Sequence, residues 1–307
     1  MAYVGIPSAR APAAVGTLSY AESRRRVAAP SSTITLFLKV LPERVVAKRF
    51  NVRRRPIAAL LPGVGAGGDV LQDAGATALV VAGAYGLVST FDSLTRRNII
   101  EQNLSRKLVH ILSGLLFLAS WPIFSTSTGA RYFASLVPSI NCLRLLIHGL
   151  SLVPDEGLIK SVTRQGKPEE LLRGPLFYVL VLILCAIVFW RDSPIGMISL
   201  AMMCGGDGIA DIMGRRFGTL KIPYNQQKSW AGSVSMFLLG FLVSICMLYY
   251  FSAFGYIKLD GMWTLERVAL ISLVATVVES LPITETMDDN ISVPLASMMA
   301  AALVFGY

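Results

Sequence analysis

From Asp69 onward the chain alternates long apolar segments with short polar connections. A helix needs about 17–25 predominantly apolar residues to cross a bilayer, and most of these segments approach or reach that length. We therefore predict an all-α fold, a polytopic membrane bundle of about seven or eight helices. The predicted segments are 72–91, 108–124, 132–153, 175–190, 194–207, 231–254, 267–282 and 291–306.

The fifth segment, 194–207, is short for a crossing. It is either a re-entrant piece or a helix completed by the polar run 207–216, which protein rather than lipid would then have to surround. The links after the first, third and fifth segments carry twelve Lys and Arg, and the alternate links carry four. This bias exists only if the fifth segment crosses, so it favours eight helices. Eight crossings also put 288–290 on the basic side, where all the charged motifs then share one face.

Composition supports a membrane protein. Only 15% of the residues are charged and 54% are hydrophobic, whereas about 25% are charged in soluble domains. The first sixty residues hold 11 of the 28 Lys and Arg and 2 of the 19 Asp and Glu, which leaves 17 of each for the remainder. Because the remainder is neutral overall, a nucleic-acid-binding surface is disfavoured.

The N-terminal segment is rich in Ala, Arg and Ser and poor in acids. This composition is typical of an organelle transit peptide. We predict a transit peptide and linker over 1–68, mostly disordered, and an integral-membrane domain over 69–307. A basic arm kept on the mature protein is the alternative interpretation.

Two carboxylates, Asp207 and Asp211, lie four residues apart in a polar run between apolar segments. That spacing puts them on one helical face. Stacked carboxylates suit a hard divalent cation such as Mg²⁺, which commonly binds together with phosphate. The alternative is a structural ion pair with Arg215, another four residues along.

Positive charge for a phosphate follows in the same region. Arg215 lies one turn beyond the aspartates, and Lys228 precedes a long apolar helix. Ser229 would cap that helix, and the N–H groups of its first turn, near Gly232, form an anion site. Glycines at 214 and 218 would allow either close helix packing or the approach of phosphate to the backbone.

The second apolar segment opens with Arg106, Lys107 and His110. Interfacial basic residues often only extend toward water. His110, however, has entered the apolar segment, where an ionisable group needs a partner and commonly marks function.

The remaining acids are Glu279 and the pair Asp288 and Asp289. Either aspartate of the pair could cap the eighth helix. Otherwise one of these acids could hold a second metal ion or accept a hydroxyl proton.

These motifs together resemble those of the plant phytol kinases, which belong to the polyprenol kinase family with farnesol kinase and, more distantly, dolichol kinase. The resemblance runs from about Asp73 to the C-terminus and is carried by 106–110, 170–178, 207–218, 225–233, 279–282 and 288–290. It implies CTP-dependent phosphorylation of phytol to phytyl phosphate in a chloroplast membrane, in salvage of phytol toward tocopherol (vitamin E). Geranylgeraniol is a second substrate that it allows.

On this hypothesis each candidate residue has a role. Distant members of the family often carry a Glu where this chain has Ala231, so a metal-holding role there is absent or has moved to Glu279. The prenyl tail would lie between helices. The candidate metal ligands are Asp207, Asp211 and Glu279. Asp289 or His110 would act on the hydroxyl, and Lys228 would lie at the transferring phosphoryl group. The candidate nucleotide-binding residues are Arg106, Lys107, Arg215, Asn225, Lys228, Ser229 and Gly232.

Two other functions remain open from the residues. A membrane cytidylyltransferase that makes a CDP-lipid shares the nucleotide and the aspartate–lysine arrangement, but it would release pyrophosphate. A carrier or channel would place Asp207 and Asp211 in a pore and would not need Lys228. Farnesol or another polyprenol is the alternative acceptor within the same family.

Overall fold

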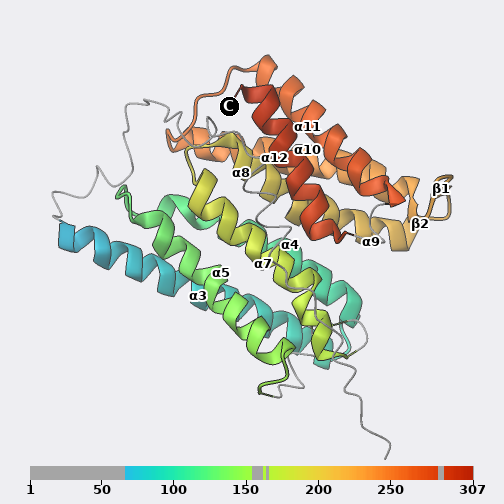
Figure 1. Ribbon diagram of the computed structural model, residues 1–307, viewed down its shortest axis with the longest axis horizontal. Coiled ribbons are helices and arrows are strands. Elements are labelled where there is room, and N and C mark those ends of the chain that lie inside the picture. The colour runs from blue at the N-terminus through green and yellow to red at the C-terminus, as the bar shows by residue number, and fades with distance from the viewer. Residues whose placement is uncertain (1–65, 154–161, 164–165, 283–286, 307) are drawn as a thin grey trace, which may run out of the picture. The chain divides into compact units, whose positions relative to one another are not determined.

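The computed structural model describes residues 66–153, 162–163, 166–282 and 287–306 (Figure 1). The predicted transit peptide lies outside these residues. The predicted linker was placed up to residue 68, but 66–68 already belong to the first described helix. The boundary of the integral-membrane domain stays a prediction.

Every predicted apolar segment contains a helix (Figure 1). The long helices are α3 (Ala66–Arg96), α4 (Gln102–Ser120), α5 (Ala130–Gly149), α7 (Gly174–Leu184), α10 (Trp230–Ala253), α11 (Met262–Ser280) and α12 (Asp289–Phe305), with short 3₁₀ turns η2 (Trp121–Ile123) and η3 (Pro168–Leu172). A π-helical turn, η4 (Cys185–Phe189), extends α7.

Four helical stretches of the described chain are long and apolar enough to cross a membrane. They are Gly67–Arg96, Pro168–Phe189, Pro194–Phe217 and Trp230–Ala253, and α12 is a shorter apolar helix. The mostly helical membrane fold is thus supported, whereas the count of seven or eight crossings stays a prediction.

The fifth segment is one continuous helical stretch, in which α8 (Pro194–Leu200) leads through a π-helical turn, η5 (Ala201–Asp207), into α9 (Gly208–Phe217). The Ser193 side chain caps its start by accepting from the Ile195 N–H. Most of the apolar part of this stretch is buried in protein, whereas its polar end is exposed at Arg215 and Arg216. The π-turn ends at Asp207, the first candidate metal ligand.

Glycines allow α10 to approach this stretch closely. A Cβ added at Gly240 would lie 3.4 Å from the Gly206 Cα, and one added at Gly232 would lie 3.5 Å from the Gly214 Cα. From the first pair to the second, the residue number falls by eight on α10 and rises by eight on the facing stretch. Both pairs therefore fit one antiparallel register. Small residues at such a crossing let two backbones meet. Gly214 therefore serves helix packing, the first of its two predicted roles.

The all-α prediction needs one small correction. Between α9 and α10 the chain forms an antiparallel hairpin of β1 (Lys221–Ile222) and β2 (Asn225–Ser229). Ser229 then caps α10 by accepting from the Gly232 N–H at 3.2 Å, as predicted. The hairpin is too short and too polar to give an apolar alternation, so the sequence pattern did not reveal it.

One end of the bundle is joined by the buried Arg191. Its guanidinium donates to the backbone oxygens of Trp121 at 3.0 Å, Phe124 at 2.9 Å and Ser125, and it lies over the Tyr256 ring. These contacts bring together the three links that the charge pattern placed on the less basic side.

Candidate active site

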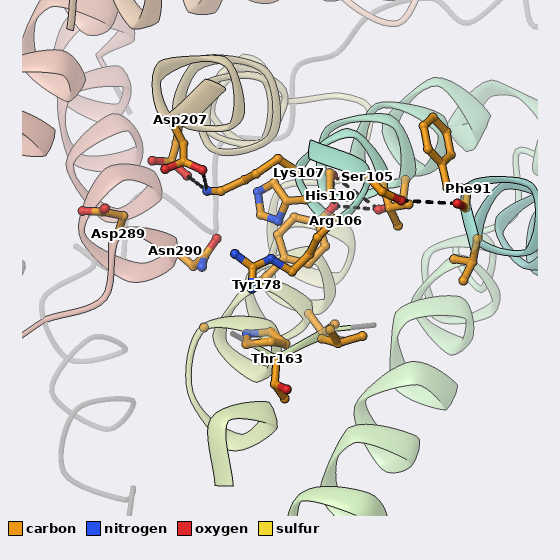
Figure 2. A pocket seen from close by; sticks show the side chains of 18 of the residues that line it. Phe91, Ser105, Arg106, Lys107, His110, Thr163, Tyr178, Asp207, Asp289 and Asn290 are labelled. Carbon is orange, nitrogen blue, oxygen red and sulfur yellow. Dashed lines mark hydrogen bonds and ion pairs between the residues drawn. The ribbon is translucent and has the colours of Figure 1, made fainter. Parts of the chain in front are cut away.

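A cavity of about 2070 Å³ contains the charged motifs. It is larger than the roughly 300–1,000 Å³ of most small-molecule sites. Every candidate site residue named from the sequence lines it except Asn225. Figure 2 shows part of it, with Lys107 reaching toward Asp207 and with Asp289 and Asn290 at the start of α12.

Three carboxylates form the centre of the charged region. Each of Asp207, Glu279 and Asp289 offers an oxygen within 4.8 Å of the others. Asp207 and Glu279 are only 5% and 3% exposed, although each carries an ionisable group. The three residues come from η5, α11 and α12, which is why no local spacing in the sequence showed the cluster.

The two neighbouring aspartates at the start of α12 have separate roles. Asp288 caps the helix, because its side chain accepts from the Asn290 N–H at 2.9 Å. Asp289 instead joins the carboxylate cluster, and its Oδ1 is buried without a hydrogen-bond partner among the described residues. The sequence left open which of the two aspartates caps the helix and which takes part in the chemistry.

Lys228, at the end of the hairpin, pairs with two members of this cluster. Its Nζ donates to Glu279 and, at 2.9 Å, to Asp289. Burial opposes the charged form, but the Glu279 and Asp289 carboxylates outweigh it and raise the pKa of Lys228 above its ordinary value. Lys228 is therefore a resident cation of the carboxylate cluster.

Lys107 lies between the two aspartates of the α9 region. Its Nζ is 3.8 Å from Asp207 and 3.5 Å from Asp211. Arg215 also donates to Asp211, at 3.0 Å. Asp211 is thus held by two cations one turn from the carboxylate cluster, an arrangement that matches the ion-pair interpretation at least as well as a metal-ligand role.

His110 lines the cavity beside Lys107, and its ring packs on Tyr178 with centroids 4.2 Å apart. The Tyr178 hydroxyl donates to the His110 backbone oxygen at 2.9 Å and lies 3.2 Å from the Ser113 hydroxyl. The His110 Nε2 is buried and has no hydrogen-bond partner in the described part of the chain. An unsatisfied buried nitrogen that lines a cavity is a candidate contact for a ligand.

Tyr178 was missed as a site residue by the sequence analysis, although it ends one of the motifs that carry the resemblance. The only signal available was a hydroxyl-bearing residue inside an apolar helix. Its contact with His110 depends on the packing of α7 beside α4, which the sequence did not specify.

Asn225 is not among the residues that line the cavity. Its side-chain amide donates to the backbone oxygens of Ser280 at 3.1 Å and Leu281 at 3.2 Å, and its oxygen accepts from the Gln227 N–H. The two bonds to Ser280 and Leu281 attach the hairpin to the end of α11, so Asn225 holds the hairpin in place.

The remaining nucleotide-binding candidates do line it. Arg106 stands beside Lys107 at the start of α4, where Figure 2 shows both. Ser229 caps α10. A Cβ added at Gly232 would lie 3.0 Å from the Ala210 oxygen, so close packing on α9 is one reason for that glycine.

Comparison with known proteins finds close similarity to plant enzymes. The chain is 66% identical over 261 residues to Phytol kinase 1, chloroplastic, of Arabidopsis thaliana, a match covering 85% of this chain and 84% of that protein. It is 69% identical over 246 residues to Probable phytol kinase 1, chloroplastic, of Glycine max, covering 80% and 81%.

A more distant relative is similar over about the same share of the chain. Probable phytol kinase 2, chloroplastic, of Oryza sativa subsp. japonica is 42% identical over 265 residues, which is 86% of each chain. No family model matches the chain, and no solved structure matches it.

Proposed function

The chain belongs to the family of the chloroplastic phytol kinases, and from this premise we propose that it transfers the γ-phosphoryl group of CTP to phytol in a plastid membrane. The product is phytyl phosphate, and the reaction serves salvage of phytol toward tocopherol. The observation that carries the proposal is one cavity lined by the clustered carboxylates together with Lys107, Lys228 and His110, all at one end of an apolar bundle.

The carboxylate cluster fits a divalent cation. Asp207, Glu279 and Asp289 supply the hard oxygen ligands that Mg²⁺ prefers, and the buried Oδ1 of Asp289 has no hydrogen-bond partner among the described residues. A cation bound there would neutralise charge on the terminal phosphates during transfer. Asp211, grouped with the metal ligands from the sequence, would instead hold Lys107 and Arg215 in place.

The basic residues would bind the triphosphate. Lys228 approaches the carboxylate cluster from the hairpin, and Lys107 approaches it from α4. Phosphoryl transfer depends mainly on positioning and on compensation of charge, so cations placed at the transferring group supply much of the rate. Arg215 and Arg106, at the edge of the same cavity, would contact phosphates further from the reacting atom.

His110 is the better of the two candidates for the hydroxyl. Its Nε2 lies buried without a hydrogen-bond partner among the described residues, whereas Asp289 is engaged by Lys228 and would also hold the cation. The alcohol oxygen forms a bond to the γ-phosphorus, the bond to the bridging oxygen breaks, and CDP leaves with that electron pair. The hydroxyl proton passes to His110 Nε2. Geranylgeraniol, with the same primary alcohol, would react in the same way.

Position-specific labels in CTP test the reaction class. Purified protein in detergent or lipid is incubated with phytol and CTP labelled at either the γ- or the α-phosphorus. We expect the γ-label in phytyl phosphate and the α-label in CDP. If the α-label appears in the lipid and pyrophosphate is released, the protein is a cytidylyltransferase and the kinase proposal is wrong.

A further inference from the structure

The cavity continues from its charged end into an apolar arm between α3, α4, α5 and α7. On α3 the lining positions recur with helical spacing from Val80 to Thr95; they are mainly apolar as far as Val88 and include Ser89, Asp92 and Thr95 toward the charged end. At 1.5 Å per residue this face is about 22 Å long, more than half of the roughly 30 Å thickness of a bilayer's hydrocarbon core. A space of this length is more than a nucleotide site requires.

Two contacts show which end of the arm is charged. The Ser105 hydroxyl donates to the Phe91 backbone oxygen at 3.4 Å, so the C-terminal part of α3 lies beside Lys107 and the start of α4. A Cβ added at Gly83 would lie 3.6 Å from Leu116, so the earlier part of α3 lies beside the later part of α4. The two helices run antiparallel, and the arm runs away from the lysines.

The far end of the arm is closed. Val80, Phe117 and Leu182 line it from three helices and are 4%, 3% and 6% exposed. Nearer the charged end the lining includes Tyr85 and Ile140, which are 71% and 56% exposed. The arm is therefore accessible along its side and blocked at its tip.

We propose that this arm holds the prenyl chain of the alcohol, with the hydroxyl at His110, and that Val80, Phe117 and Leu182 limit the length of chain that fits. This inference rests on the proposed function and adds the residues that determine which alcohols the site accepts. Because the alcohol comes from lipid rather than from water, moving its chain into an apolar space yields little hydrophobic gain. Discrimination between chains must then come from packing and shape.

Val80→Trp tests the limit by shortening the arm. We expect the ratio of kcat/KM for phytol and geranylgeraniol to that for geraniol to fall by roughly 10- to 100-fold, since each surplus or missing group in an apolar pocket changes specificity by about this factor. Val80→Ala should shift the preference toward alcohols longer than geranylgeraniol. Leu79→Trp is the matched control, because Leu79 is the neighbouring residue and is 60% exposed. It should leave the ratio unchanged.

Equal loss of activity toward all alcohols in Val80→Trp, with no shift in Val80→Ala, would overturn the assignment. A second measurement is independent of turnover: a prenyl alcohol with a diazirine at the chain tip is photolysed on the wild-type protein. The inference predicts adducts on the peptides that contain Val80 and Phe117, and adducts only on other helices would contradict it. Adducts at the predicted peptides without any phosphorylation of phytol would refute the kinase proposal while leaving the chain-binding arm in place.

Discussion

At the scale of single residues, two lysines of the site each lie between two carboxylates. Lys107 pairs with Asp207 and Asp211, and Lys228 pairs with Glu279 and Asp289. Removing one partner of a buried ion pair leaves the other charges uncompensated and costs roughly 3–5 kcal/mol. The lysines therefore affect both the stability of the site and its chemistry, and experiments must separate the two effects.

Lys228→Met should lower the rate of phytyl phosphate formation by at least roughly 100-fold, because a cation at the transferring phosphoryl group is lost. It should also lower the melting temperature, since Glu279 and Asp289 lose their partner. Adding Glu279→Gln removes one of the unpaired charges, so the double variant should regain stability without regaining activity. Lys258→Met, at an exposed lysine, is the control and should change neither. Wild-type turnover by Lys228→Met would remove Lys228 from the mechanism.

Asn225→Ala separates a nucleotide-binding role from a positioning role. The variant loses two hydrogen bonds that fix the hairpin to the end of α11 and a third, from the Gln227 N–H, within the hairpin. Each is worth about 0.5–1.5 kcal/mol, so the free energy of unfolding should fall measurably. The KM for CTP of the folded fraction should stay within about threefold, a shift of less than 1 kcal/mol. A large rise in that KM without any change in melting temperature would restore the sequence-based assignment.

At the scale of helices and strands, apolar length was a dependable signal. The predicted segment 231–254 is α10, Trp230–Ala253, and 175–190 covers α7 with η4. A run of about twenty apolar residues leaves the backbone few alternatives to a helix. The π-turn at Ala201–Asp207 and the hairpin had no comparable signal, because both arise from packing around them.

The glycine crossing gives a prediction at this scale. A side chain at Gly240 would meet the Met202 sulfur at 2.6 Å and the backbone of Gly206 at 3.4 Å, and backbone cannot move aside. Gly240→Val should therefore separate α10 from η5, displace Asp207 and Asp211 and reduce both the folded yield and the turnover. Overpacking of this kind typically costs about 1–3 kcal/mol.

Gly86→Val on α3 is the matched control, since nothing lies within 4 Å of a Cβ there. It should fold and turn over like the wild type. The yield is measured as the monodisperse fraction after extraction in detergent. Equal yields of the two variants would show that the crossing does not depend on Gly240.

At the scale of the whole described molecule, the polar groups gather at two ends. Arg191 binds the backbone around Trp121 and Phe124, whereas the carboxylates and lysines of the site lie at the other end of the helices. Charge counting in the connections predicted this separation. It could not predict which acids would meet, because Asp207, Glu279 and Asp289 are far apart in sequence and only the fold brings them together.

Eight crossings predict which loops face the same side of the membrane. Single cysteines are placed at the exposed Arg97 and Thr219 on the active-site side and at the exposed Thr128 and Asp260 on the other. Cys142 and Cys246, the accessible native thiols, are first replaced by Ser. In sealed, oriented vesicles an impermeant maleimide should label one pair before permeabilisation and the other pair only after it. Labelling of both Thr219→Cys and Thr128→Cys before permeabilisation would contradict the arrangement with eight crossings.

The central claim is that the carboxylates from η5, α11 and α12 form the phosphoryl-transfer centre. The most direct measurement is the rate of phytyl phosphate formation from CTP and phytol by purified Asp207→Asn, a near-isosteric change at a residue only 5% exposed. With the melting temperature and elution profile of the wild type, the variant should be slower by at least roughly 100-fold. A folded Asp207→Asn protein that phosphorylates phytol at the wild-type rate would place the chemistry elsewhere.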